Sequence, residues 1–252
     1  MIKRKIRINI HDYPAELHPL LGAGEIYDSS SSPQAQTLYC TAGFYVKTAP
    51  KSTLFLEAEL CRRFHSMGLG VEVTHYLSTD KDYFVTRCAL GDDLLHHLDE
   101  PKTVCRILAS ALRMLHSQPT QNLPVSALFR TYTEPKDAPS NEFLPIKRFP
   151  ISSKEEALQI IHASKHKLKA DTLIHGDACL PNIICHEGKF STFIDLGQAG
   201  VGDRHMDLYW AIWSLEFNLQ TDDYTDYFLD LYGADAVDPD VLKLIAALEY
   251  LS

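Results

Sequence analysis

A short segment around residue 180 collects the polar side chains that could do chemistry. In LIHGDACLPNIICHEGKFSTFIDLGQAGVG, residues 173–202, Asp177 follows one expected strand, Asn182 begins the next and Asp195 ends a third. Two carboxylates and one carboxamide at the ends of adjacent strands converge on one spot rich in oxygen ligands. Such ligands suit Mg²⁺, which takes further oxygens from phosphates. Phosphoryl transfer from a nucleotide needs that metal and a base that orients the attacking hydroxyl, so the segment predicts this chemistry.

The first 90 residues, which must support part of this site, predict mostly strands. Strands are expected where residues 3–10 alternate basic and isoleucine side chains, and over residues 37–48, 71–77 and 82–88. One helix is expected over residues 54–66, with Leu56, Leu60 and Phe64 on one face. A four-serine run at residues 29–32 predicts a tight polar loop between strands.

After Gly91 the apolar spacing becomes helical. Helix starts are expected after Asp99, at the Ser153–Glu156 capping box and at Asp238–Pro239. Six prolines within residues 119–150 predict a loop with short helices at most. Short strands are expected over residues 172–174, 183–185 and 191–194. We therefore expect an α+β protein with a strand-rich N-terminal lobe, residues 1–90, and a mainly helical C-terminal lobe, residues 91–252.

The motif around Asp177 resembles that of a known enzyme family. HGDxxxxN, followed by an IDLG strand end, is similar to the aminoglycoside O-phosphotransferases, which are relatives of the protein kinases. The longer string HGDACLPN…FIDLG…GVGDRHMDL resembles the branch that phosphorylates a 3'-hydroxyl. The resemblance is strong over residues 173–211 and looser over nearly the whole chain. It implies a two-lobed protein-kinase-like fold whose N-terminal lobe binds nucleotide and whose C-terminal lobe binds substrate and carries catalysis.

The resemblance also implies roles for individual residues. Asp177 matches the catalytic aspartate that orients the substrate hydroxyl, and Asn182 and Asp195 match the two Mg²⁺-binding positions. His175 matches a histidine that supports the loop and transfers no proton. Taken singly, Asp177 could instead cap a turn and Asn182 could be an ordinary strand-entry residue; their joint spacing with Asp195 favours the functional interpretation.

In the N-terminal lobe, Lys47 at the end of FYVK matches the strand lysine that contacts nucleotide phosphates. Its partner is expected to be Glu57 on the following helix, with Glu59 as the alternative. No GxGxxG motif is present, and Ser32 occupies the place of the phosphate-contacting loop residue. The resemblance places the adenine-binding hinge near residues 87–90.

Other polar residues of the C-terminal lobe have structural or substrate roles by resemblance. Asp203 and Asp207 match an acidic pair that ties a helix start to the catalytic loop, and Asp203 is expected to cap that helix. Glu249 matches a glutamate that contacts substrate amines. Two departures from the family are Gln198, where an arginine is usual, and Ser252, which extends the C-terminus by one residue. The acceptor loop, residues 117–150, is also less acidic than the family pattern.

Two alternative interpretations concern the cysteines and the aromatic residues. His175, Cys179, Cys185 and His186 are zinc-type ligands, but their spacing matches no recognised zinc site. The six cysteines contain no CxxC pair and predict reduced thiols in a cytoplasmic protein. The aromatic residues between Tyr209 and Phe228 could stack on a ligand, but their helical spacing beside leucines favours core or half-buried packing.

The charge distribution narrows the choice of partners. The net charge is −9, and residues 201–252 hold eleven acidic residues against two basic ones. Such a stretch repels a nucleic-acid backbone and attracts a cation, unless its acids only line solvated helix faces. The chain has no apolar run long enough to span a membrane and no secretory signal.

The resemblance implies an ATP- or GTP-dependent kinase that phosphorylates a hydroxyl of an aminoglycoside, expected to be the 3'-hydroxyl, and so confers antibiotic resistance. One alternative is a kinase of the same fold that acts on another small metabolite; Gln198 and the mixed charge of the acceptor loop favour it. A second alternative is a catalytically silent nucleotide-binding module. The intact set of Lys47, Asp177, Asn182 and Asp195 argues against that second interpretation.

Overall fold

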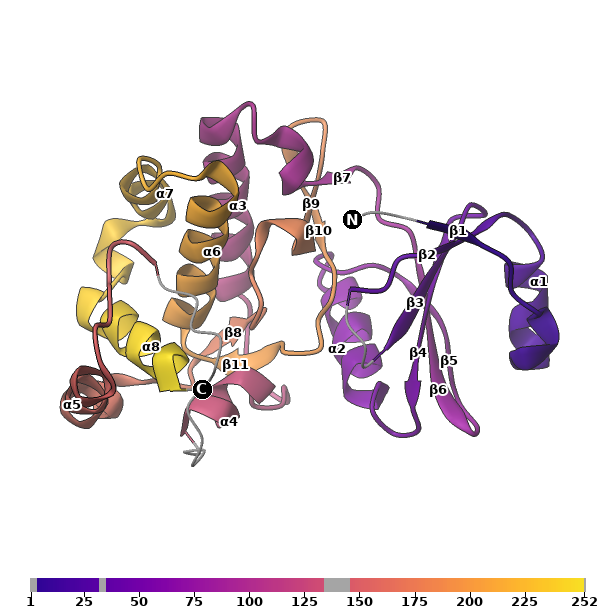
Figure 1. The fold of residues 1–252 in the computed structure, drawn as a ribbon, viewed down its shortest axis with the longest axis horizontal. Helices are drawn as coiled ribbons and strands as arrows, with labels where there is room; N and C mark the ends of the chain where they lie inside the picture. The colour runs from indigo at the N-terminus through magenta and orange to yellow at the C-terminus, as the bar shows by residue number, and fades with distance from the viewer. Residues whose placement is uncertain (1–3, 32–34, 134–145, 252) are drawn as a thin grey trace. The chain divides into compact units, whose positions relative to one another are not determined.

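The chain folds into two compact units, each with its own core (Figure 1). The computed structural model describes residues 4–31, 35–133 and 146–251. The first unit comprises Met1–Leu90 together with the short segment Thr192–Gly197. The second unit comprises Gly91–Ser191 and Gln198–Ser252.

A six-stranded antiparallel sheet in the order β1-β2-β3-β4-β6-β5 forms the body of the first unit. Its strands are β1 (Arg4–Ile6), β2 (Ile26–Asp28), β3 (Gln36–Cys40), β4 (Phe44–Pro50), β5 (Val73–Ser78) and β6 (Lys81–Arg87). The strand expected over residues 37–48 is a hairpin, turned at Gly43 with φ of 94°. The N-terminal strand is shorter than predicted because Ile10 already begins a 3₁₀ helix, Ile10–Asp12, capped by the Asn9 side chain. β2 was not predicted.

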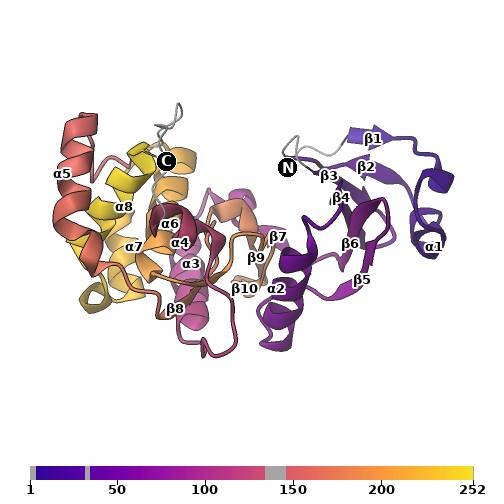
Figure 2. The same cartoon turned by 90° about the horizontal axis from the view of Figure 1, so that it is seen from below.

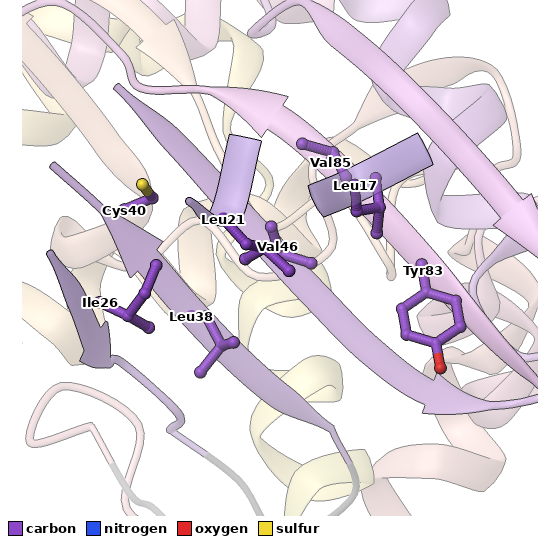
Figure 3. Packing of buried hydrophobic residues seen from close by; sticks show 8 residues of the cluster. All are labelled: Leu17, Leu21, Ile26, Leu38, Cys40, Val46, Tyr83 and Val85. Atoms are coloured by element: carbon purple, nitrogen blue, oxygen red, sulfur yellow. The ribbon is translucent and has the colours of Figure 1, made fainter. Parts of the chain in front are cut away.

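Two layers of helix cover the two faces of this sheet. The 3₁₀ helix Ala15–Leu17 and α1 (His18–Leu21), neither of them predicted, cover one face. Figure 3 shows the apolar cluster beneath them, formed by Leu17, Leu21, Ile26, Leu38, Cys40, Val46, Tyr83 and Val85. Because successive side chains of a strand point to opposite faces, Val46 enters this cluster and the adjacent Lys47 points to the other face, where α2 lies.

The helix α2 (Phe55–Ser66) agrees with the helix predicted over residues 54–66. Leu60 and Phe64 are buried as expected, whereas Leu56 is only half-buried. The Phe64 ring meets Phe193 edge-on at 6.3 Å between centroids. The Phe193 amide also donates to the Leu69 carbonyl oxygen at 2.8 Å. These contacts attach the segment Thr192–Gly197 to the first unit, although residues 91–191 of the second unit separate it from the rest of that unit in the chain.

The second unit is mainly helical. Its α-helices are α3 (Pro101–His116), α4 (Ala127–Thr133), α5 (Lys154–Ser164), α6 (Arg204–Leu219), α7 (Thr225–Tyr232) and α8 (Pro239–Leu251). α3 packs against α7, and α8 packs against both α5 and α6, as Figures 1 and 2 show. The predicted starts at Ser153 and Pro239 are confirmed. The N-cap of α3 is Glu100, one residue after the expected Asp99.

Short strands connect these helices and carry the motif residues. They are β7 (Asp92–Asp93), β8 (Thr172–Ile174), β9 (Ile183–His186), β10 (Lys189–Phe193) and β11 (Gly200–Gly202), in two sheets ordered β10-β9-β7 and β11-β8. β8, β9 and β10 match the predicted strands within one to two residues. β11 was not predicted; it pairs antiparallel with β8, with Gly200 opposite Ile174.

The side chains of the helical unit follow the predicted burial pattern. On α3, the apolar residues that recur at helical spacing after Gly91 are buried: Val104, Ile107, Leu108, Ala111 and Leu115. Tyr209 and Phe228 are fully buried and Trp210 and Trp213 half-buried, which confirms that these aromatic residues pack in the protein. The six cysteines, all of them described, form no disulfide with one another. Within the described ranges, every helix is too short or too polar to cross a lipid bilayer.

Candidate active site

The first unit holds Lys47 between two carboxylates. Lys47 Nζ donates to Glu57 Oε1 at 2.8 Å and Oε2 at 2.9 Å, and to Asp195 Oδ1 at 3.1 Å. β4 presents the lysine, the first turn of α2 presents the glutamate, and the segment after Phe193 presents the aspartate. Glu59 instead pairs with Arg62 on the exposed side of α2. The structure therefore selects Glu57 over Glu59 as the partner of Lys47.

Burial and charge act in opposite directions on this ion pair. Burial lowers the pKa of the Lys47 ammonium, but the Glu57 and Asp195 carboxylates outweigh it and leave that pKa above its ordinary value. Burial raises the pKa of the Glu57 carboxyl, and the Lys47 charge opposes this only in part. Lys47 is thus a fixed positive charge at neutral pH. Its side chain is 24% exposed, so the ammonium remains accessible to an anionic ligand.

Asp195 adopts an unusual backbone conformation. Its φ is 58°, in the left-handed region that aspartate tolerates better than most residues. The strand β10 ends at Phe193, so the left-handed residue turns the chain immediately after the strand. Lys47 binds Oδ1 of Asp195, and the carboxylate, 47% exposed, leaves Oδ2 for a further ligand.

The second unit holds Asp177 and Asn182 together in one loop, residues 175–182, which we call the HGD loop. Asn182 Nδ2 donates to Asp177 Oδ2 at 2.9 Å and to the Asp177 carbonyl oxygen at 3.0 Å. Both bonds use the side-chain amide nitrogen of Asn182. The residue as a whole is 9% exposed. No hydrogen bond among the described residues uses its oxygen, Oδ1. Asn182 therefore fixes the Asp177 carboxylate.

Asp207 on α6 anchors the start of the HGD loop. This fully buried carboxylate accepts hydrogen bonds from the His175 and Gly176 amides, both at 2.8 Å. The prediction that Asp207 ties a helix to the loop is confirmed. His175 Nδ1 accepts from the Asp177 amide at 3.2 Å, which confirms its supporting role and places the ring proton on Nε2.

Gly176 permits a close approach that a side chain would block. Its φ is 81°, and a Cβ there would lie 2.4 Å from the carbonyl oxygen of Gln198. That carbonyl is itself held by Ser126 Oγ, which donates to it at 2.7 Å. On the other side of the loop, Ser214 Oγ accepts from the Leu180 amide at 3.0 Å. Sequence reasoning missed Ser126 and Ser214 because an isolated serine in a helix or loop carries no motif.

Asp203 is the N-cap of α6, as predicted. Its carboxylate accepts from the His205 amide at 3.0 Å and from the Lys169 amide at 2.9 Å. Burial raises the pKa of Asp203, but the hydrogen bonds from His205 and Lys169 outweigh it and hold that pKa below its ordinary value. Asp203 thus fixes the start of α6, the helix that carries Asp207.

The predicted metal-binding residues suit Mg²⁺ by the chemistry of their donor atoms. Asn182 in the second unit and Asp195 in the first unit each keep an oxygen that no described residue binds. Carboxylate and carboxamide oxygens are each ligand types that a hard cation such as Mg²⁺ takes. The zinc alternative gains no support: burial raises the pKa of the Cys179 and Cys185 thiols. The described part of the chain holds no group of three or more His, Cys, Asp or Glu side chains placed for a metal.

Some predicted site residues lie outside the described part of the chain, and for others the structure gives only position and burial. Ser32 lies outside the described residues, as do Ser252 and positions 134–145 of the acceptor loop. Glu249 lies on α8 and is half-buried. Gln198, which stands in place of the family arginine, has an exposed side chain.

The acidic residues of the C-terminal stretch are not all solvated. Asp203, Asp207 and Glu216 are buried, and Glu216 accepts from the Lys147 amide at 2.7 Å and from the Thr225 hydroxyl at 3.2 Å. Several others pair with basic residues outside the stretch: Asp222 with Lys147, Asp226 with Arg148, and Asp238 and Asp240 with Lys167. The interpretation of these acids as solvated helix faces therefore holds only for part of them.

Comparison with known proteins gives matches along the whole chain. Residues 30–245 match the family model described as "Phosphotransferase enzyme family" (APH). A probable aminoglycoside 3'-phosphotransferase of Lactococcus lactis subsp. lactis (strain IL1403) is 42% identical, over 98% of this chain and 97% of that protein. An aminoglycoside 3'-phosphotransferase of Niallia circulans is 32% identical, over 67% of this chain and 66% of that protein.

Solved structures show a shared fold. Aminoglycoside phosphotransferase APH(3'')-Id from Streptomyces rimosus ATCC10970 superposes with a TM-score of 0.76 at 19% identity, covering 98% of this chain and 100% of that one. Its complex with ADP and streptomycin gives a TM-score of 0.72 at 20% identity, covering 96% and 98%. The predicted α+β, kinase-like fold class is confirmed.

Proposed function

Because the chain belongs to the phosphotransferase enzyme family, we propose that it transfers the γ-phosphoryl group of ATP or GTP to the 3'-hydroxyl of an aminoglycoside antibiotic and thereby confers resistance. The observation that carries the substrate class is the near-full-length match to the Lactococcus relative. The ADP-bound structure of the Streptomyces protein supports a nucleotide as the phosphoryl donor.

In this proposal Lys47 binds the nucleotide phosphates. Lys47 Nζ donates two hydrogen bonds to Glu57, which hold the ammonium in place before the nucleotide binds. The lysine side chain therefore loses less conformational entropy when the nucleotide binds. The raised pKa of Lys47 keeps its charge over the physiological range. Ser32 of the polar loop is assigned a phosphate contact by resemblance.

Asp177 is the group that accepts the proton of the attacking hydroxyl. Asn182 fixes Oδ2 of the carboxylate, so the proton is accepted at Oδ1. The hydroxyl oxygen forms a bond to the γ-phosphorus, the bond from phosphorus to the β–γ bridging oxygen breaks, and the nucleoside diphosphate leaves. Asn182 Oδ1 and Asp195 would hold Mg²⁺, which neutralises phosphate charge when bound. The protein contributes mainly position and fixed charge.

The substrate of such an enzyme is a polycation, and the charge of the chain suits it. The net charge of −9 arises from residues 201–252, and several acids there remain exposed, such as Asp223, Asp230 and Asp235. Glu249 on α8 is assigned a contact with a substrate amine. A negative potential of this kind raises the local concentration of a cationic substrate and its association rate.

The test is a coupled assay of nucleoside-diphosphate release by the purified chain with Mg²⁺ and ATP or GTP. The acceptors are kanamycin-type drugs, which carry a 3'-hydroxyl, and tobramycin-type drugs, which lack it. Asp177→Asn is expected to lower kcat by at least about a thousandfold, in the range typical of general-base loss combined with misorientation. The matched control is Asp171→Asn, an exposed aspartate just before β8.

Each outcome has a definite meaning. Turnover confined to the kanamycin-type acceptors supports the proposal in full, and turnover with both groups moves the modified position to another hydroxyl. Silence on both groups with nucleotide binding intact would favour the alternative of another metabolite acceptor. Near-normal turnover of Asp177→Asn would refute the role of Asp177.

A further inference from the structure

An open pocket of about 640 Å³ lies in the second unit, and none of the residues proposed for catalysis lines it. α3 supplies most of its wall, and the start of α6, the end of α7 and the 3₁₀ helix Ala234–Ala236 complete it. Its volume falls within the range of small-molecule sites in proteins.

Three arginine side chains give the pocket a positive charge. Arg106 and Arg113 are two helical turns apart on the same face of α3, and Arg204 is the first residue of α6. Ala109 and Ser110 lie between the two arginines of α3, and their small side chains leave the hollow open. No aspartate or glutamate is among the described residues that line it. Three positive charges therefore share one pocket in a chain whose net charge is −9.

Each guanidinium is held by a neutral acceptor and keeps most of its donors. Arg106 Nη2 donates to Thr103 Oγ1 at 2.8 Å, Arg113 Nη1 to the Leu231 carbonyl oxygen at 3.3 Å and Arg204 Nη2 to Thr172 Oγ1 at 3.5 Å. None of the three forms an ion pair with a carboxylate in the described part of the chain. A guanidinium has five donors in a planar fork that matches phosphate and carboxylate oxygens. One hydrogen bond to a neutral acceptor therefore orients each guanidinium, and no carboxylate among the described residues pairs with its charge.

We propose that this pocket, which we call the arginine pocket, binds a small molecule with two or more phosphate groups. The mutual repulsion of three guanidinium groups falls when an anion lies between them, so binding is favourable without any change of fold. One phosphate bridges Arg106 and Arg113, and the volume leaves room for a second phosphate that reaches Arg204. Several of these donors are exposed, so the affinity is expected to weaken as salt is added.

The back wall of the arginine pocket is connected to the HGD loop. His116, which lines the pocket, contacts Tyr232 through Nδ1 at 2.8 Å and Asp207 through Nε2 at 3.1 Å. Asp207 in turn holds the His175 and Gly176 amides. The carboxylate can only accept, so Nε2 of a neutral His116 carries the proton and Nδ1 accepts from the Tyr232 hydroxyl. A ligand against Tyr232 and Arg204 therefore stiffens a chain of hydrogen bonds that ends at the HGD loop.

Calorimetric titration with inorganic tripolyphosphate in metal-free, low-salt buffer tests the binding. We expect saturable binding that Arg106→Gln/Arg113→Gln weakens at least about tenfold. Arg113→Lys, which keeps the charge but loses the planar fork, is expected to give an intermediate affinity. Arg63→Gln is the matched control, since Arg63 is an exposed arginine on α2 outside the pocket.

A Lys47→Met variant separates this site from the proposed nucleotide site, because tripolyphosphate resembles a nucleotide tail. Binding that survives Lys47→Met and is lost in the double arginine variant supports the arginine pocket. Absence of binding, or loss only in Lys47→Met, would overturn it. Since the readout is heat of binding, the result stands whether or not the chain turns over an aminoglycoside.

Amide hydrogen exchange measured by NMR tests the connection to the HGD loop. Saturating tripolyphosphate is expected to slow exchange of the His175 and Gly176 amides at least about twofold in Lys47→Met, where the nucleotide site is disabled. The double arginine variant should show no such change. Unaltered exchange at these two amides despite bound ligand would refute the connection while leaving the binding site intact.

Discussion

Replacing Asp207 by alanine is expected to be among the most damaging single changes in the second unit. The carboxylate is fully buried and accepts from three donors: the His175 amide and the Gly176 amide, each at 2.8 Å, and His116 Nε2 at 3.1 Å. Alanine removes the acceptor and leaves all three donors in place. Because the vacated site is buried, bulk water does not solvate these donors, and only a trapped water molecule could replace the lost oxygen atoms.

The magnitude follows from the number of donors left unpaired. Each buried donor without an acceptor costs about 1–3 kcal/mol. A water molecule that enters the vacated volume can satisfy one or two of them, so we expect a loss near the lower end, about 4 kcal/mol for the three donors together. A chain of this size loses about 2–4 °C of Tm per kcal/mol, which gives a fall of about 8–16 °C. Asp207→Asn keeps one acceptor oxygen and should lose about half as much.

Urea denaturation followed by circular dichroism measures this loss, with Asp223→Ala as the control. Asp223 is an exposed aspartate, and its replacement should change the midpoint little. An unchanged denaturant slope would show that the free energy of unfolding has changed and not the extent of unfolding. A loss below about 1 kcal/mol for Asp207→Ala would mean that the three hydrogen bonds do not anchor the HGD loop.

Further predictions concern the other groups that hold the site. Gly176→Ala is expected to abolish activity and destabilise the fold, because its Cβ would lie 2.4 Å from a backbone oxygen; a variant that folds and turns over normally would contradict the observed loop geometry. Glu57→Gln should raise the KM for nucleotide about tenfold with a smaller effect on kcat, since Lys47 loses a charged partner; steady-state kinetics with an unchanged KM would refute its role. Asp203 has a lowered pKa in the folded state, so its stabilising contribution is present above the unfolded pKa and lost as pH falls through the folded pKa. The stability difference between wild type and Asp203→Asn, about 1–2 kcal/mol at neutral pH, should therefore begin to shrink as the pH falls through the ordinary aspartate pKa of 3.8 and continue to shrink below it; urea titrations that give the same difference at neutral pH and well below that value would count against it.

Local signals in the sequence predicted the elements that depend on local interactions. The starts of α5 and α8 are marked by Ser153 and Pro239, whose side chains act within one helical turn, and the buried face of α3 follows from its apolar period. The cap at Asp203 was likewise predicted because its acceptor role is local. Such features require only a few neighbouring residues to identify.

Contacts between distant residues could not be read in the same way. Lys47 meets Asp195 across 148 positions of the chain, and His116 meets Asp207 across 91. Neither pair has a periodicity or a spacing of its own, and only the resemblance to a family indicated that Lys47 and Asp195 act together. β11 was missed for a related reason, because the three residues Gly200–Gly202 become a strand only through pairing with β8.

The charges around Lys47 explain why a divalent cation belongs in the proposed mechanism. One ammonium faces the two carboxylates of Glu57 and Asp195, so this group of three side chains is net negative when all are ionised. A triphosphate that approached it without a cation would meet repulsion from the group as a whole, although Lys47 itself attracts. In the proposed mechanism Asp195 would hold a divalent cation, whose charge would make the group net positive, while Glu57 would continue to hold the lysine. On this proposal Asp195 would attract the metal, whereas Glu57 places the ammonium.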